Sequence, residues 1–333
     1  MKVSIVIPVY HVAPYIAACL QSVMAQTWQG QLECILVDDG GTDDSMAVAE
    51  AQLKDYAGSI DFRIVHHERN RGLSAARNTG TDAATGDYVY FLDSDDEITP
   101  DCIECLARPL SDEAYDLVVG DYQILGSDMD KPPLLLQDGA VLRGKDVLRA
   151  YRRAEWYMMS VNKLYRTDFL RQHRLNFYEG IIHEDELWSF QIACLAQSLC
   201  AVGRETYLYK VRAGSITAKK DQKYRCDSIS VILYEMHRFA KENHLQGNKD
   251  VHDVQRNFLM IMMYSVYKDS PSFFRSFYME QRQAKIISWE ECFWRNGFDI
   301  RKQLRDLHQL LPVSLAMSYL KLLFCFLNMR HGR

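Results

Sequence analysis

Acidic residues occur in short clusters whose spacing could support metal binding and acid–base chemistry. The most specific cluster is Asp93-Ser94-Asp95-Asp96, which directly follows the apolar run Tyr88 to Leu92. Hard divalent ions take one or two carboxylates and complete their coordination with water and phosphate oxygens. An Asp-x-Asp pair just past a buried strand therefore predicts a site for Mg²⁺ or Mn²⁺ bound to a diphosphate, with Asp93 and Asp95 as ligands.

A second acidic pair, Asp38-Asp39, precedes Gly40 and also follows an apolar run. A carboxylate at such a turn can accept a hydrogen bond from a nucleobase N–H or a ribose hydroxyl. The alternative is an ordinary turn in which Thr42 or Asp43 caps the next helix. The pair is thus a candidate nucleoside contact whose structural interpretation stays open.

A third cluster, Glu184-Asp185-Glu186, follows His183 at the start of a predicted helix. The helix dipole stabilises ionised acids in the first turn, so one of these carboxylates could act as a general base. Ordinary first-turn acids are the alternative. We expect His183 to cap the helix or line the pocket rather than to bind metal.

The segment Asn70 to Gly80 joins a glycine turn to a helix of small residues and carries Arg71 and Arg77. Both arginines can neutralise an anion near the edge of the sheet. Arg77 can equally be a structural arginine that is tied to carboxylates of the sheet.

Short, wholly apolar runs predict the strands that position these clusters. They are Val3 to Pro8, Leu32 to Val37, Phe62 to Val65 and Tyr88 to Leu92, and helical patterns alternate with them. Such alternation predicts βαβ units with right-handed crossovers in a doubly wound parallel sheet. Ligands bind beyond the carboxyl ends of such strands, which is where the polar clusters fall.

The later part of the chain has a different pattern. A further strand is predicted at Leu117 to Val119, and a loop or edge excursion at Gly126 to Gly139. From about Ala140 the pattern is mostly helical, with one strand-like stretch at Tyr207 to Val211. We place a boundary near Gly214. This gives a sheet-containing domain over 1–214, with two parts (1–125 and 126–214), and a helical region over 215–333.

Composition excludes several functional classes. The 333 residues include 39 Lys and Arg against 44 Asp and Glu, a net charge of −5 without a basic run, so nucleic acid is not an expected partner. Of the nine cysteines only Cys102 and Cys105 have CxxC spacing, which helical packing explains, and the N-terminus lacks an export signal, so a reduced, cytoplasmic setting is expected. Neither GxGxxG nor a P-loop motif follows the first apolar run, which disfavours a nicotinamide or flavin cofactor and a P-loop nucleotide site.

Taken together, the motifs resemble those of the family 2 glycosyltransferases, which are inverting enzymes of the GT-A fold. The likeness runs from Met1 to about Thr217 and covers five stretches in the family's order: Ser4 to Tyr10, Val37 to Gly40, Gly72 to Gly80, Gly86 to Asp95 and His183 to Asp185. The resemblance implies a GT-A nucleotide-binding fold with a mainly parallel sheet flanked by helices. It also implies that residues 1–214 are the catalytic domain, with a nucleotide-sugar half (1–125) and an acceptor half (126–214). His11 and Gly41 depart from the usual asparagine and serine.

The resemblance also implies roles for single residues. It assigns Asp39 to the nucleobase, usually uracil, Asp93 and Asp95 to the metal and diphosphate, with Asp95 the more direct, and Asp185 to the general base. Residues implied to line the nucleotide pocket are Pro8, Tyr10 and Arg71, and Lys163 and Arg212 match recurrent positions. The expected donor is a UDP-hexose or UDP-N-acetylhexosamine, and the expected acceptor is a glycan or a lipid-linked molecule in cell-surface polysaccharide or lipopolysaccharide synthesis.

The C-terminal stretch Leu310 to Leu327 is strongly apolar, but Pro312 and Lys321 interrupt it. It is too broken to predict a membrane span. Basic residues on both sides fit an interfacial helix that contacts the inner face of the cell membrane. The alternative is a helix that packs on the catalytic domain or on the second subunit of a homodimer.

Two other functions fit parts of the pattern. A sugar-nucleotide pyrophosphorylase shares an α/β fold and acidic metal ligands, but it would need a glycine-rich loop where this chain has Tyr10 to Pro14. A non-catalytic scaffold that retains the fold is the other alternative, and the presence of Asp93, Asp95 and Asp185 disfavours it.

Overall fold

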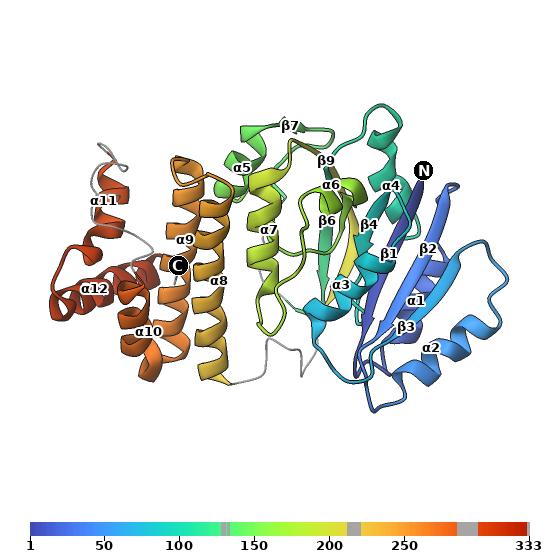
Figure 1. Cartoon of the computed structure of the whole chain (residues 1–333), viewed down its shortest axis with the longest axis horizontal. Helices are drawn as coiled ribbons and strands as arrows, with labels where there is room; N and C mark the ends of the chain where they lie inside the picture. Colours follow the sequence, from blue (N-terminus) through green and yellow to red (C-terminus); the bar gives the residue numbers. More distant parts are fainter. Residues whose placement is uncertain (128–130, 132–133, 212–220, 285–298, 332–333) are drawn as a thin grey trace. The chain divides into compact units, whose positions relative to one another are not determined.

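A computed structural model describes residues 1–127, 131, 134–211, 221–284 and 299–331 (Figure 1). The chain divides into two compact units, Met1–Lys219 and Lys220–Arg333. The predicted boundary near Gly214 lies outside the described residues, as does Arg212. All other candidate site residues belong to the first unit.

The first unit is built on a nine-stranded mixed sheet with the order β3-β2-β1-β4-β8-β6-β9-β5, and β7 pairs with β9. The strands are β1 (Lys2–Val9), β2 (Gln31–Asp38), β3 (Asp61–His66), β4 (Tyr88–Phe91), β5 (Glu97–Ile98), β6 (Leu117–Leu125), β7 (Val141–Arg143), β8 (Lys163–Arg166) and β9 (Ser198–Lys210). Helices flank this sheet, so the predicted fold class is confirmed: a largely parallel α/β sheet and a helical C-terminal region.

The four strands predicted from apolar runs form the parallel half of the sheet, because β1 pairs in parallel with both β2 and β4, and β2 pairs in parallel with β3. The centres of β1, β2 and β4 are buried on both faces, whereas the edge strand β3 is only partly buried. Val3, Ile5, Val6 and Ile7 of β1, for example, have no exposed surface. Two-sided burial favours continuous apolar sequence, which is why these strands could be predicted.

The second half of the sheet differs from the sequence-based expectation. Strand β8 runs antiparallel to both β4 and β6, and β9 begins at Ser198 instead of Tyr207. The chain after Ala140 is mostly helical as predicted, but the expectation of a single strand there was wrong, because β7, β8 and β9 all follow Ala140. Lys163 and Asn162 are completely buried at the start of β8, and buried polar residues of this kind hide a strand from an apolar pattern.

The helices of the first unit are α1 (Ile16–Met24), α2 (Ser45–Lys54), α3 (Leu73–Ala83), α4 (Cys102–Ala107), the 3₁₀ helix η1 (Arg108–Ser111), α5 (Lys145–Arg152), α6 (Thr167–Gln172) and α7 (Glu184–Leu195). Helix α3 packs directly on β1 and β2. A Cβ atom added at Gly80 would lie 2.2 Å from Val6 Cγ1, so the small residues of α3 allow this close approach.

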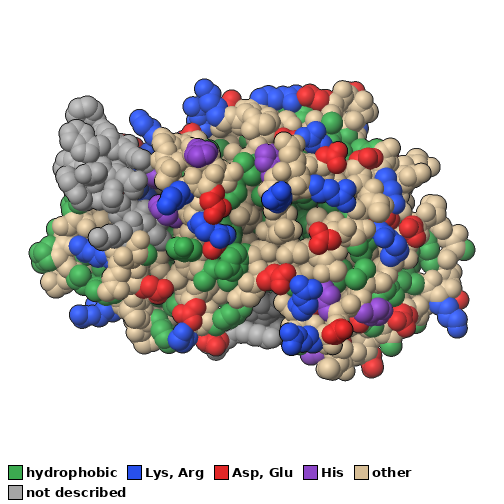
Figure 2. All heavy atoms as spheres, in the orientation of Figure 1, with side chains coloured by type: hydrophobic (Ala, Val, Ile, Leu, Met, Phe, Trp, Pro, Cys, Tyr) green, Lys and Arg blue, Asp and Glu red, His purple; other side chains and the backbone are tan. Residues whose placement is uncertain are grey.

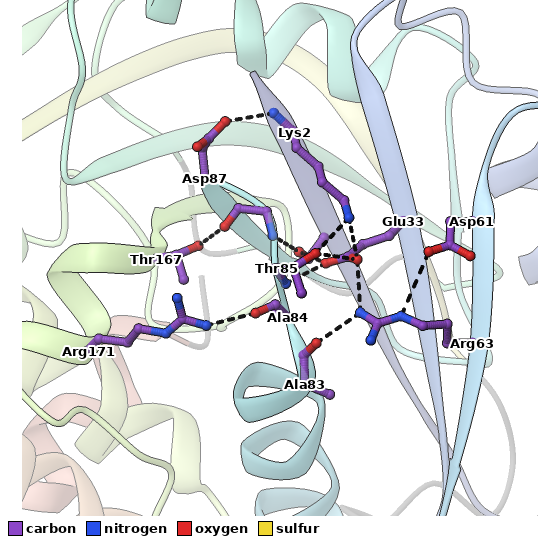
Figure 3. A network of polar contacts seen from close by, with 12 residues as sticks. Lys2, Glu33, Asp61, Arg63, Ala83, Ala84, Thr85, Asp87, Thr167 and Arg171 are labelled. Atoms are coloured by element: carbon purple, nitrogen blue, oxygen red, sulfur yellow. Dashed lines mark hydrogen bonds and ion pairs between the residues drawn. The ribbon is translucent and has the colours of Figure 1, made fainter.

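A buried carboxylate fastens the amino-terminal ends of the central strands (Figure 3). Glu33 on β2 has no exposed surface and accepts hydrogen bonds from Ser4, Arg63 and both the amide and the hydroxyl of Thr85. Lys2 Nζ lies 2.7 Å from Glu33 Oε2. This network joins β1, β2 and β3 to the turn that starts β4, at the end of the sheet opposite the polar clusters.

The second unit is helical and consists of α8 (Gln222–Glu242), α9 (Lys249–Asp269), α10 (Pro271–Gln283), α11 (Ile300–Asp306), the 3₁₀ helix η4 (Leu307–Gln309) and α12 (Val313–His331). One face of α12 is buried within this unit, and the Phe324 ring contacts Tyr264, Tyr267 and Phe274. Leu315 and Leu322 are 57% and 63% exposed. None of the described helices has the length and apolar character needed to cross a bilayer.

Charged side chains of both signs are interspersed over the face drawn in Figure 2. No field of one sign dominates that view, in keeping with the small net charge of −5. A long polyanion such as nucleic acid requires a basic surface, and this face does not offer one.

Candidate active site

The acidic turn after β4 is held from behind by strand β9. The Tyr207 hydroxyl donates to Asp96 Oδ2 at 2.6 Å and accepts from the Asp93 amide at 3.3 Å, while the Lys210 amide donates to Asp96 Oδ1 at 2.7 Å. Asp96 is 2% exposed, whereas the Asp93 side chain is 28% exposed and Asp95 is partly exposed. Asp96 therefore fixes the turn, and Asp93 and Asp95 are left accessible.

Negative charge accumulates at this turn. Burial, together with the charges of Asp93 and Asp95, raises the pKa of Asp96 to about 8. Burial is the larger cause of this shift, and a bound cation would offset the part that comes from the charges of Asp93 and Asp95. The turn thus has the electrostatic character of a cation site.

The donor set also fits a hard divalent ion. Asp93 uses Oδ1 to accept from Arg77, and among the described residues nothing donates to its Oδ2. The described part of the chain holds no group of three or more His, Cys, Asp or Glu side chains arranged for a metal. Two carboxylates that leave positions for water and phosphate oxygens are the arrangement expected for Mg²⁺ or Mn²⁺ with a diphosphate.

Arg77 joins the metal-binding turn to the predicted general base. Its guanidinium is 1% exposed and donates to Asp93 at 2.8 Å, to Glu184 at 2.9 Å and to Asp185 at 3.1 Å. Arg77 is therefore the structural arginine of the two alternatives, but its carboxylate partners are site residues. Because one planar guanidinium makes both contacts, the bonded oxygens of Asp93 and Asp185 lie within about 8 Å of each other.

The three acids of α7 differ in their surroundings. Glu184 is 8% exposed, and burial and the neighbouring Asp185 raise its pKa. Burial and Asp185 likewise raise the pKa of Glu186 to about 7. The Asp185 side chain is 24% exposed and is the one that shares Arg77 with Asp93 from an accessible position. His183 precedes the helix in the left-handed region, with φ of 62°, and makes no side-chain cap hydrogen bond.

Asp39 lies at the carboxyl end of β2 and organises the loop before α3. It is 2% exposed and accepts from the amides of Arg71 and Gly72, both at 2.8 Å, and its Oδ1 lies 2.7 Å from His67 Nδ1. His67 also contacts Thr79 of α3 through Nε2. Asp38 is more exposed and contacts the Gly40 amide and His66. The pair therefore shapes the turn, and Oδ2 of Asp39 has only one donor among the described residues.

The remaining pocket residues lie at the same carboxyl ends. Pro8 is buried in β1, and Tyr10 just beyond it is 39% exposed and stacks on His11 with ring centroids 4.1 Å apart. His11 has φ of 53°, and its Nε2 accepts from the Thr42 amide at 3.2 Å. The half-exposed Arg71 pairs with Glu179 at 3.3 Å.

Lys163 is completely buried, so it does not face the solvent-accessible part of the site. Its ammonium lies 3.7 Å from the centroid of the Tyr157 ring and donates to the Met159 carbonyl. Burial lowers its pKa well below the ordinary value. Through these contacts Lys163 supports the segment that contains Tyr157 and Met159.

Sequence reasoning did not single out His67, Tyr207 or Asn78. Asn78 donates to the Phe177 carbonyl at 2.9 Å and accepts from the Phe177 amide at 2.8 Å, so it holds the segment that leads to α7. His67 directly follows β3, which pairs with β2. The predicted order of the strands could therefore have placed His67 near Asp39 at the end of β2. Tyr207 and Asn78 contact residues 114 and 99 positions away, and nothing local in the sequence indicates such pairs.

The sequence model described as "Glycosyl transferase family 2" matches residues 4–174. This chain belongs to that family. Among its relatives is EpsH of Bacillus subtilis (strain 168), which is 34% identical over 251 residues, covering 72% of this chain and 70% of EpsH. The protein is therefore a glycosyltransferase, and the pyrophosphorylase and scaffold alternatives are set aside.

Solved structures share the fold of this glycosyltransferase. The structure of S. aureus TarS 1–349 in complex with UDP-GlcNAc aligns with a TM-score of 0.65 at 19% identity, over 96% of this chain and 88% of that one. The mannosyltransferase PcManGT from Pyrobaculum calidifontis, in complex with GDP-Man and Mn²⁺, aligns with a TM-score of 0.50 at 15% identity, over 85% of this chain and 84% of that one. At these identities the likeness is one of fold.

Proposed function

We propose that this glycosyltransferase moves a sugar, with inversion, from a UDP donor to a hydroxyl of a glycan or lipid-linked acceptor in cell-surface polysaccharide or lipopolysaccharide synthesis. The observation that carries the proposal is the shared contact of Asp93 and Asp185 with Arg77. An inverting transfer needs a charge-neutralised leaving group on one side of the sugar and a base on the other. Carboxylates within about 8 Å of each other can flank one sugar ring.

Asp93 and Asp95 would hold Mg²⁺ or Mn²⁺ against the diphosphate. Such an ion, when bound, stabilises the negative charge that develops on the departing diphosphate. The partly exposed side chains of Asp93 and Asp95 at this turn support the assignment. Tyr207 and Asp96 would keep the two ligands oriented.

The loop that Asp39 organises would bind the nucleoside. Oδ2 of Asp39 can accept a further bond, such as that from the uracil N–H, and the half-exposed Arg71 can contact an anionic part of the donor. Pro8, Tyr10, Asp38 and Arg212 complete the proposed nucleotide contacts. The fold shared with TarS, which was solved with UDP-GlcNAc, supports a UDP-hexose or UDP-N-acetylhexosamine donor.

Asp185 would remove the proton of the acceptor hydroxyl as that oxygen attacks. Its partly exposed carboxylate can reach a bound hydroxyl, and its contact with Arg77 fixes its orientation. Attack from the face opposite the diphosphate inverts the anomeric carbon, so an α-configured donor gives a β-linked product. We assign this chemistry to the catalytic domain predicted over 1–214.

A screen of nucleotide sugars tests the proposed function. Thermal stabilisation and slow donor hydrolysis would be measured for UDP, GDP and dTDP sugars, each with Mn²⁺ and with a chelator. We expect at least one UDP sugar to stabilise the protein and to release UDP only when Mn²⁺ is present. Stabilisation by GDP sugars alone would overturn the donor assignment, and equal UDP release in the chelator would overturn the role of the metal.

A cytoplasmic protein at the inner face of the membrane is part of the proposal. Leu315 and Leu322 lie one above the other on the exposed face of α12, where they could enter a bilayer interface or contact a second copy of the chain. Flotation with anionic vesicles separates these outcomes when the wild type is compared with a Leu315→Asp, Leu322→Asp variant. Loss of flotation supports membrane contact, whereas loss of a dimer in sedimentation supports a homodimer.

A further inference from the structure

Arg77 is charged and almost fully enclosed. Burial by itself lowers the pKa of Arg77, but Asp93, Asp185 and Glu184 raise it above its ordinary value. An arginine that is 1% exposed must find its compensation within the protein, because water cannot supply it. Its carboxylate partners come from two separate parts of the proposed site.

The two terminal nitrogens of Arg77 divide these partners. Nη2 donates to Asp93 in the turn after β4, and Nη1 donates to Glu184 and Asp185 at the start of α7. One rigid fork therefore spans the donor side and the acceptor side of the site. A lysine would carry the same charge but could not hold both sides in one plane.

An aromatic stack limits the movement of the guanidinium. Arg77 lies over the Phe177 ring, with 5.1 Å between its Cζ atom and the ring centroid. Phe177 stacks on Trp188 of α7 at 4.1 Å and 10°, and its ring is 5.3 Å from that of Phe91, the last residue of β4. The Phe177 ring is therefore an aromatic platform: it contacts Arg77, the strand that leads to Asp93 and the helix that carries Asp185.

From these contacts we propose that Arg77 is a positioning residue that holds Asp93 and Asp185 at one fixed separation. It is too deeply buried to touch the substrate, so it acts through the two carboxylates. The contact with Arg77 also orients Asp185, whose side chain is partly exposed. Glu184, the other partner in α7, is only 8% exposed and is therefore less accessible to an acceptor. This inference rests on the proposed function and adds to it the requirement that the metal side and the base side share one support.

The conservative variant Arg77→Lys tests the proposal. We expect kcat for UDP release from the donor to fall by at least about 10²-fold, because displacement of about 1 Å at a reacting group has that effect. The KM for the donor, measured with Mn²⁺, should rise by no more than the several-fold loss of metal-assisted binding, since the nucleoside loop is not touched. By calorimetry, the gain in UDP affinity on adding Mn²⁺ should shrink several-fold, while the affinity without metal stays the same.

Arg166→Lys is the matched control. Arg166 also pairs with a buried aspartate, Asp116, at 2.5 Å, but it lies at the other end of the sheet. This variant should keep the wild-type kcat and the wild-type response to Mn²⁺. An equal fall of kcat in both lysine variants would overturn the proposal, because general weakening of the unit would then explain the loss.

A purely structural role of Arg77 gives a different result. Arg77→Lys would then melt at a lower temperature but would keep the wild-type kcat and Mn²⁺ response when folded, and this outcome overturns the proposal. If Arg77→Lys does not fold, Phe177→Leu is the substitute test. It removes the aromatic ring beneath Arg77 and keeps the ion pairs of Arg77 with its carboxylate partners. We expect its kcat to fall about tenfold with unchanged metal-free UDP affinity, and an unchanged kcat would overturn the proposal.

Failure of the proposed function itself is distinguishable. A wild-type protein without metal-dependent UDP binding or donor cleavage would remove both the function and this inference. An active wild type with an equally active, folded Arg77→Lys variant would remove this inference alone.

Discussion

Replacing Asp39 by asparagine tests whether this buried carboxylate organises the nucleoside loop. The carboxylate accepts from the amides of Arg71 and Gly72 and pairs with His67, and it is 2% exposed. Asparagine keeps one acceptor oxygen and places an N–H₂ group where the second oxygen was. At least one backbone amide of the loop then faces a donor and loses its partner.

The expected cost follows from these contacts. A hydrogen bond to a charged acceptor contributes about 1.5–3 kcal/mol, and a buried donor left without a partner costs about 1–3 kcal/mol. Because the two effects concern the same group and do not add fully, we expect Asp39→Asn to lower the free energy of unfolding of the first unit by about 2–4 kcal/mol. UDP affinity should fall at least about tenfold, since the loop that carries Arg71 is no longer held.

Urea denaturation monitored by tryptophan fluorescence, together with calorimetric titration of UDP, measures both effects. Asp38→Asn is the control for the denaturation measurement only, because Asp38 is more exposed and an asparagine can satisfy both of its contacts, the Gly40 amide and His66. We expect that variant to lose less than about 1 kcal/mol. Equal losses in the two variants, or a fully stable Asp39→Asn protein, would refute the reasoning.

Three further predictions concern other parts of the first unit. Asp185→Asn should lower transfer by at least about 10²-fold and leave UDP affinity within twofold, as steady-state kinetics and calorimetry will measure; unchanged turnover would assign the base role to Glu184 or Glu186. Burial raises the pKa of Glu33, but hydrogen bonds from Lys2, Ser4 and Thr85 outweigh it and hold the pKa at about 2. Because the folded-state pKa lies below the unfolded one, this contribution to stability is complete above about pH 4.5 and is lost as the pH falls toward 2, so Glu33→Gln should flatten the acid limb of a denaturation series. Gly80→Ala should destabilise by about 1–3 kcal/mol despite the better helix propensity of alanine, because its Cβ would meet Val6 at 2.2 Å, whereas Gly247→Ala, with open space around it, should be neutral in thermal melts.

The parallel half of the sheet could be predicted because each strand carries a short apolar run, and three of the four, β1, β2 and β4, are buried on both faces. Strand β8 could not, since Lys163 and Tyr165 point into a polar and aromatic interior that only the folded chain supplies. The early part of β9 was missed for a related reason. Its pairing with β6 is set by long-range packing and includes irregular register at Gly120 to Tyr122.

The site residues divide in the same way, into those that local sequence indicates and those that only long-range packing brings together. Residues at the carboxyl ends of predicted strands, such as Asp39 and Asp93, could be placed from the order of elements alone. The partner of Arg77 could not, because Asp185 lies 108 residues away and nothing local in the sequence pairs them. The sequence left Arg77 between two interpretations, and the folded chain decides for the structural one: Arg77 is buried and bonded to carboxylates that belong to the proposed metal site and the proposed base.

The metal dependence of UDP binding tests the central claim most directly. Calorimetric titration of UDP into the wild-type protein and into Asp95→Ala would be run with Mn²⁺ and with a chelator. The account predicts that Mn²⁺ strengthens UDP binding to the wild type and that Asp95→Ala removes this gain without changing the metal-free affinity. Equal UDP affinity of the wild type with and without the metal would contradict it.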